Sequence, residues 1–149
     1  MITLGSDGEM LIKSFETLAL KAYQDPGGVW TIGWGHTPAD EGWECTDVQA
    51  EDWFQTDVQR TIEGIEATLT TGLAQYQADA LISFTYNVGV GNEQHSTMLK
   101  LINQRAFLEA SCEFAKWDLV GGVPSKGLMR RRMAERALFT NQPWQQFLV

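Results

Sequence analysis

The sequence predicts an α+β fold that is mainly α-helical and carries one small antiparallel β-hairpin. Three patterns lead to this prediction. Residues 21–34 hold two short strand-like runs around a strong turn signal, residues 46–69 repeat apolar side chains at helical spacing, and residues 75–88 are apolar nearly all round. A small sheet combined with amphipathic and buried helices is typical of this fold class. At 149 residues the chain is long enough to bury a core as one domain.

The first predicted element is a helix that starts at Ser6. Ser6 and Glu9 have the spacing of a capping box, which satisfies backbone N–H groups of a first helical turn. We expect the helix to end near Glu16, where the negative end of the helix dipole opposes ionisation and suits a general acid. Three apolar side chains form its expected inner stripe: Leu11, Phe15 and Leu18.

The second predicted element is a β-hairpin with strands at residues 21–24 and 29–34. The turn Asp25-Pro26-Gly27-Gly28 separates them, because Asp accepts local backbone hydrogen bonds, Pro fixes φ and Gly permits positive φ. Asp25 alone would be an ordinary turn former. However, Glu16, Asp25 and Thr31 bring two carboxylates and a hydroxyl together within sixteen residues. Cleavage of a glycosidic bond needs one carboxylic acid for the leaving oxygen and a second carboxylate for the developing cation.

The remaining predicted elements are helices. Thr46 and Gln49 form a second capping box at the start of the long amphipathic helix. Residues 75–88 predict a central helix that ends at Gly89. Shorter helices are expected near 97–103 and 106–116, followed by one at about 127–140. In the last helix we expect Met129, Met133 and Ala137 to point inward and Arg130, Arg131 and Arg132 to be partly exposed.

Composition and charge exclude several classes of protein. The formal net charge is −8, with −11 on residues 1–80 and +3 on residues 81–149, so nucleic acid is not expected as the main ligand. The asymmetry fits either two differently solvated faces or a basic part that meets an anionic polymer. No run approaches the roughly 18 apolar residues of a membrane span, and the N-terminal ten residues lack the basic region of a signal peptide.

Neither metal nor cofactor is expected, since two isolated histidines do not make a ligand cluster. Cys45 and Cys112 lie far apart in sequence and do not form a disulfide framework. Cys112 follows Leu108 and precedes Phe114, so we expect it to be a buried thiol that acts as a small hydrophobe, although a bridge to Cys45 stays open.

The spacing of Glu16, Asp25 and Thr31 resembles the signature of the phage-type lysozymes, glycoside hydrolase family 24. That signature is a Glu, eight intervening residues, an Asp or Cys, five more residues and a Thr. The run that starts at Thr31 is similar to the family's Thr-Ile-Gly-Tyr-Gly-His-Thr, with Trp34 in place of the Tyr.

Two later stretches extend this resemblance over nearly the whole chain. Residues 83–89 look like the central-helix motif of the family, and residues 127–135 look like its Gly-Leu-x-x-Arg-Arg-x-x-Glu segment. The resemblance implies a lysozyme-like fold with two lobes. A small β lobe is expected at about residues 18–50 and a helical lobe at about residues 70–149, joined by the long helix.

The resemblance implies a muramidase that hydrolyses the β-1,4 bond between N-acetylmuramic acid and N-acetylglucosamine in bacterial peptidoglycan. Glu16 would be the general acid. Asp25 would stabilise the oxocarbenium-like state and orient water with help from Thr31, with inversion at the anomeric carbon. The expected protein is a monomeric phage endolysin without stable membrane association. It would be made in the host cytoplasm and would act on the wall in the periplasm after membrane permeabilisation.

Other residues receive roles from the same resemblance. The family places an Asp of the long helix against the histidine of its motif, which implies a structural pair between His36 and Asp57. Asn87, Trp117 and Arg130 are expected to contact substrate, although Asn87 could instead tie its helix to a neighbouring backbone and Trp117 could be a core aromatic. Two alternatives to the endolysin stay open: a secreted antibacterial muramidase effector, and a non-catalytic wall-binding module on the same fold.

Overall fold

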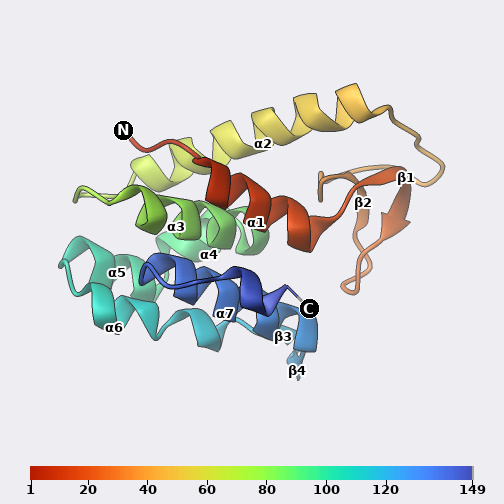
Figure 1. Cartoon of the computed structure of the whole chain (residues 1–149). Helices are drawn as coiled ribbons and strands as arrows, with labels where there is room; N and C mark the ends of the chain where they lie inside the picture. Colours follow the sequence, from red (N-terminus) through yellow and green to blue (C-terminus); the bar gives the residue numbers. More distant parts are fainter. Residues whose placement is uncertain (149) are drawn as a thin grey trace.

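The computed structural model describes residues 1–148 and shows a helical body with a small β-hairpin at one end (Figure 1). The elements in chain order are α1 (Ser6–Glu16), β1 (Ala19–Gln24), β2 (Trp30–Gly33), α2 (Asp47–Glu66), α3 (Gln75–Val88), α4 (Val90–Gln94), α5 (Thr97–Asn103), α6 (Phe107–Ser111), the 3-10 turn η1 (Phe114–Lys116), β3 (Leu119–Val120), β4 (Val123–Pro124), α7 (Lys126–Phe139) and the 3-10 turn η2 (Gln145–Phe147). The predicted α+β, mainly helical class is confirmed.

Helix α1 ends at Glu16 as predicted, but its predicted capping box is wrong. The N-cap is Gly5, and no side chain caps the first turn. Instead, the Gly5 backbone N–H donates to Oδ1 of Asp79 on α3 at 2.7 Å. A partner 74 residues away therefore satisfies the helix start, which the local Ser6–Glu9 spacing does not reveal.

The predicted hairpin is present as the antiparallel pair β1–β2. Tyr23 lies opposite Thr31, and Gln24 lies opposite Trp30. In Figure 1 the hairpin stands beside the C-terminal end of α1 and near the start of α2. The hairpin thereby brings the turn at Asp25 and the end of α1 into one region of the molecule.

Helix α2 carries the predicted capping box, in which the Thr46 side chain and the Gln49 side chain satisfy each other's backbone N–H groups. The helix runs from the hairpin end along the length of the helical body (Figure 1). Helix α3 is the central helix, as predicted, and ends at Gly89 with a φ of +92°. Both helices contribute to one core of apolar side chains together with α1 and α7, including Leu11, Phe54, Ile65, Leu81, Phe84 and Leu138.

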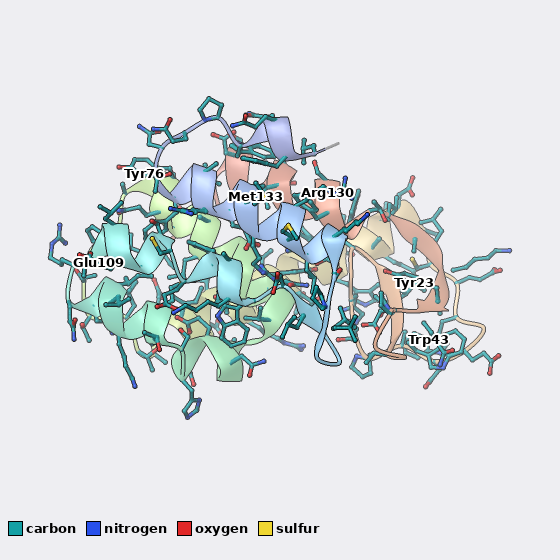
Figure 2. All side chains as sticks on the ribbon, turned by 90° about the horizontal axis from the view of Figure 1, so that it is seen from below. Tyr23, Trp43, Tyr76, Glu109, Arg130 and Met133 are labelled. Atoms are coloured by element: carbon teal, nitrogen blue, oxygen red, sulfur yellow. The ribbon has the colours of Figure 1, made fainter. Side chains whose placement is uncertain are left out.

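The orientation predicted for α7 is wrong in most of its residues. Met129 and Met133 are each 43% exposed, and Figure 2 shows Met133 at the surface of the helix. Arg131 and Arg132 are buried instead, at 3% and 1% exposure. Burial of these arginines is possible because acidic and carbonyl partners from other elements surround them, as described below.

Two short elements were not predicted from the sequence, and one prediction about a cysteine is wrong. Residues 90–94 form the short helix α4, and the short β3–β4 hairpin precedes α7. Cys112 is exposed rather than buried, and both cysteines are free thiols. Among the described residues, the helices fall short of the length and apolar character that a bilayer crossing requires.

Candidate active site

Glu16 occupies the last position of α1, and its side chain is only 16% exposed. Its Oε1 lies 2.5 Å from Nη1 of Arg131, 115 residues further along the chain. Its Oε2 lies directly against Gly35, where an added Cβ would overlap the carboxylate oxygen. Gly35 also has a φ of +76°, so a side chain there would be both strained and obstructed. The carboxyl group is therefore fixed from two sides.

Arg131 is held by a second, fully buried carboxylate. Its Nε donates to Oε1 of Glu135 at 3.1 Å, and its Nη2 donates to the Ser83 carbonyl at 3.1 Å. The Ser83 hydroxyl donates to the same Glu135 oxygen at 2.8 Å. Burial lowers the pKa of Arg131, but the Glu16 and Glu135 carboxylates outweigh that effect and raise it above the ordinary value. The guanidinium therefore carries a permanent positive charge beside Glu16.

Arg132 completes this buried cluster from the other side of Glu135. Its Nη1 lies 2.5 Å from Oε2 of Glu135, and its Nε donates to the Trp117 carbonyl at 2.9 Å. Burial lowers the pKa of Arg132, and Glu135 acts against that shift. Two carboxylates and two guanidinium groups thus balance in charge inside the protein, which is the condition under which buried ions are tolerated.

The side chains of Asp25 and Thr31 are both hydrogen-bonded to the backbone of Val29. Oδ1 of Asp25 accepts from the Val29 N–H at 2.8 Å, and the Asp25 carbonyl accepts from the Gly28 N–H at 2.8 Å. The Thr31 hydroxyl donates to the Val29 carbonyl at 3.0 Å. Since its own hydrogen is engaged, Oγ1 of Thr31 is left as an acceptor. The turn therefore sets the positions of a carboxylate and a hydroxyl oxygen relative to each other.

Tyr23 of β1 lies beside the pair formed by Asp25 and Thr31. It lies opposite Thr31 in the antiparallel register, so their side chains share one face of the hairpin. Burial raises the pKa of Tyr23, and the negative charges of Glu16 and Asp25 raise it further. The charges of both carboxylates therefore act on the same phenol, which lies opposite Thr31 and which sequence reasoning missed.

His36 and Asp57, the predicted structural pair, are in contact. His36 Nδ1 lies 2.7 Å from Oδ2 of Asp57, and the imidazole stacks on Trp53 with ring centroids 4.8 Å apart. An open cavity of about 210 Å³ adjoins this pair, and Gly35, Asp57 and Tyr86 are among its lining residues. The Tyr86 hydroxyl donates to the Trp34 carbonyl at 2.6 Å, which ties α3 to the loop that carries Gly35.

The three predicted substrate contacts have different environments. Asn87 is exposed at the end of α3, and its Oδ1 accepts from Nη2 of Arg132. Trp117 is half-buried and packs edge-on against Phe84 with centroids 5.5 Å apart. Arg130 is exposed, and Figure 2 shows it on α7 at the end nearest the β1–β2 hairpin. Of these three residues, Arg130 offers a charged side chain at the surface.

Sequence reasoning missed Arg131 and Glu135, although it had identified the segment that holds them. The Arg-Arg-x-x-Glu spacing places Arg131 and Glu135 four residues apart, on one face of a helix, and Arg132 three residues before the same glutamate. This spacing was the available signal for a buried ion cluster. Within residues 1–148, no group of three or more His, Cys, Asp and Glu side chains is arranged to hold a metal ion.

Comparison with known proteins gives a consistent result. The family described as "Phage lysozyme" matches residues 13–135. The endolysin of Bacillus phage PZA is 41% identical over 138 residues, which are 90% of this chain and 54% of that protein. The endolysin of Acyrthosiphon pisum secondary endosymbiont phage 1 is 39% identical over 91% of this chain and 97% of its own.

Solved structures agree with this. An endolysin from Escherichia coli O157:H7 phage FAHEc1 superposes with a TM-score of 0.84 at 32% identity, over 95% of this chain and 97% of that one. The muramidase domain of SpmX from Asticcacaulis excentricus gives 0.84 at 35% identity, over 93% and 98%. The chain belongs to the phage lysozyme family. It spans about half the length of the Bacillus phage endolysins that it matches.

Proposed function

We propose that this protein is a muramidase that hydrolyses the β-1,4 bond between N-acetylmuramic acid and N-acetylglucosamine in peptidoglycan, in the role of a phage endolysin. The observation that carries the proposal is the placement of Glu16 at the end of α1, fixed between Arg131 and Gly35. Membership of the phage lysozyme family supports the substrate class, and the endolysins of similar length support the biological role.

Glu16 acts as the general acid in the proposed reaction. It transfers its proton to the glycosidic oxygen as the bond to the anomeric carbon breaks. The carboxylate that remains is stabilised at once by the Arg131 guanidinium, which already lies 2.5 Å from Oε1. Arg131 needs no reorganisation at this step, because Glu135 and the Ser83 carbonyl hold it independently of Glu16.

Asp25 and Thr31 prepare the attacking water on the other side of the sugar. A water that donates one hydrogen to Oγ1 of Thr31 and the other to the Asp25 carboxylate directs a lone pair toward the anomeric carbon. Asp25 receives the proton as the new bond to oxygen forms, and its charge stabilises the oxocarbenium-like state. Attack from the face opposite the leaving group gives inversion.

Substrate contacts complete the proposal. Arg130 meets an anionic group of the peptidoglycan chain, because it is an exposed cation of α7 at the end nearest the β1–β2 hairpin. Asn87 and Trp117 border the same region through Arg132, which contacts the Asn87 side chain and the Trp117 carbonyl. We propose that the enzyme acts on the wall in the periplasm once the membrane has been opened.

The test is lysis of Gram-negative cells whose outer membrane has been permeabilised. Loss of turbidity on addition of the purified protein, with new reducing ends at N-acetylmuramic acid, is the expected result. Reducing ends at N-acetylglucosamine would contradict the assigned bond. Binding to the wall without release of any reducing end would favour the non-catalytic wall-binding module.

A further inference from the structure

Glu135 is the most enclosed carboxylate of the ion cluster. Its side chain has 0% exposure, and both carboxylate oxygens accept hydrogen bonds. Oε1 accepts from Arg131 Nε and the Ser83 hydroxyl, and Oε2 accepts from Arg132 Nη1. Among the described residues, its hydrogen-bond partners belong to α3 and α7, and neither Glu16 nor the hairpin is one of them. One buried anion is therefore shared between two guanidinium groups, of which one contacts the proposed acid.

We propose that Glu135 is a positioning residue that determines the pH range over which Glu16 retains its proton, acting through Arg131. This inference rests on the proposed function. Without Glu135, the positive charges of Arg131 and Arg132 would be balanced by Glu16 alone, and Glu16 would be held in its ionised form. With Glu135 present, one of these two positive charges is offset. Protonation of Glu16 then leaves a net charge of +1 in the cluster rather than +2, so Glu16 takes up the proton that the reaction needs more readily.

The other titratable groups near Glu16 do not supply this balance. The groups that face it come from three elements and are Tyr23 of β1, Tyr86 of α3, and Arg131, Arg132 and Glu135 of α7. Burial raises the pKa of both tyrosines, and nearby carboxylates raise it further, so both stay neutral across the working range. Asp25, on the turn between β1 and β2, acts on the same tyrosine as Glu16 and is unchanged in every variant compared below. The charges that contact Glu16 directly or through Arg131 are those of α7, and these are the charges that the variants change.

The sign of the expected effect follows from this arrangement. The alkaline limb of the pH profile of kcat/KM reports loss of the proton from the essential acid of the free enzyme. Glu135→Gln removes a negative charge, stabilises ionised Glu16 and moves this limb to lower pH. Arg132→Gln removes a positive charge and moves the limb to higher pH. Direct opposite charges move a carboxyl titration by about 1–3 units, so we expect about one pH unit for charges that act through Arg131.

The experiment measures the rate of reducing-end release from solubilised peptidoglycan fragments between pH 4 and pH 9, roughly the range in which carboxyl and histidine groups titrate. Glu135→Asp keeps the charge and should leave the limb near the wild-type position, although kcat falls because the side chain is shorter. Glu109→Gln, an exposed residue of α6 at the far end of the molecule (Figure 2), is the matched control for net charge. Arg105→Gln controls for Arg132→Gln in the same way.

Each outcome decides a separate question. Opposite shifts in Glu135→Gln and Arg132→Gln, with unmoved controls, support the inference. A limb that stays in place in a folded Glu135→Gln variant overturns it, and if that variant does not fold, an unmoved limb in Arg132→Gln does the same. In either case wild-type activity that depends on Glu16 leaves the proposed function standing. Absence of reducing-end release by the wild type overturns the proposed function instead.

Discussion

Single residues fix the geometry of the site by close contacts from opposite ends of the chain. Glu16, Asp25 and Thr31 were predicted from sequence because one helix end and one turn present them within a short segment. The role of Arg131 was not predicted, because its contact with Glu16 joins two positions that lie 115 residues apart in the sequence. A sequence also gives no reason to bury an arginine until its partners are known.

Thr31 gives the first prediction at this scale, since its hydroxyl rather than its shape is proposed to matter. Thr31→Ser keeps the oxygen acceptor and should retain appreciable activity. Thr31→Val keeps the shape but removes the acceptor, so wall-clearing activity should fall by about 10²-fold or more, the lower range of positioned acid–base effects. The Val variant also loses the hydrogen bond to the Val29 carbonyl, which costs about 1 kcal/mol. Melting curves of both variants identify any loss that comes from unfolding. Full activity in a folded Val variant would place the water elsewhere.

Gly35 gives the second prediction, because a Cβ atom added at this position would overlap Oε2 of Glu16. Gly35→Ala should displace the Glu16 carboxyl and lower kcat at least about tenfold, because a displacement of about 1 Å can cost 10²-fold. It should also lower the free energy of unfolding by about 1–2 kcal/mol, since alanine is strained at a φ of +76°. Gly42→Ala is the matched control. Its φ is +84°, but nothing lies within 4 Å of the added Cβ. Equal losses of activity in the two variants would show that backbone strain, not displacement of Glu16, is responsible.

Secondary-structure elements were predicted best where local signals decide their limits. The Thr46 capping box predicted the start of α2 correctly, and Gly89 predicted the end of α3 correctly. The inward face of α7 was wrong, because a stripe of methionine and alanine at helical spacing competed with a stripe of paired charges. The charged stripe faces inward because its partners, Ser83 of α3 and the Trp117 carbonyl, lie on other elements.

Helix α4 gives a prediction about stability and pH. Glu93 is fully buried, and neither of its carboxyl oxygens has a hydrogen-bond partner among the described residues. Burial raises its pKa to about 7, whereas an unfolded glutamate titrates near ~4.3. The folded state therefore binds the proton more tightly, and stability contributed by protonated Glu93 is lost as pH rises from about 4 through 7.

Glu93→Gln should remove this dependence. The variant should match the wild type within about 1 kcal/mol at pH 4 and exceed it by roughly 3 kcal/mol at pH 8, an order-of-magnitude figure from the pKa difference. Urea unfolding at both pH values measures the difference, with Glu109→Gln as an exposed control. A constant difference between the wild type and the Glu93 variant across pH would refute the account of Glu93.

The whole molecule places one carboxyl on the helical body and the other on the hairpin. Glu16 ends α1 and is held by α7, while Asp25 lies on the turn between β1 and β2 (Figure 1). Substrate bound between the two would therefore contact both parts of the structure. The overall arrangement was predictable from sequence through family resemblance, but the ion cluster that joins α1 to α7 was not.

The central claim is that Glu16 is the acid of a peptidoglycan glycosidase, and Glu16→Gln tests it most directly. The amide keeps the size of the side chain but cannot donate an acidic proton, so release of N-acetylmuramic acid reducing ends should fall about 10²–10⁴-fold. The melting transition should stay cooperative, which shows that the variant is folded. Retention of more than about a tenth of wild-type activity in a folded Glu16→Gln variant would contradict the assignment, since the range expected for a positioned acid begins at about 10²-fold.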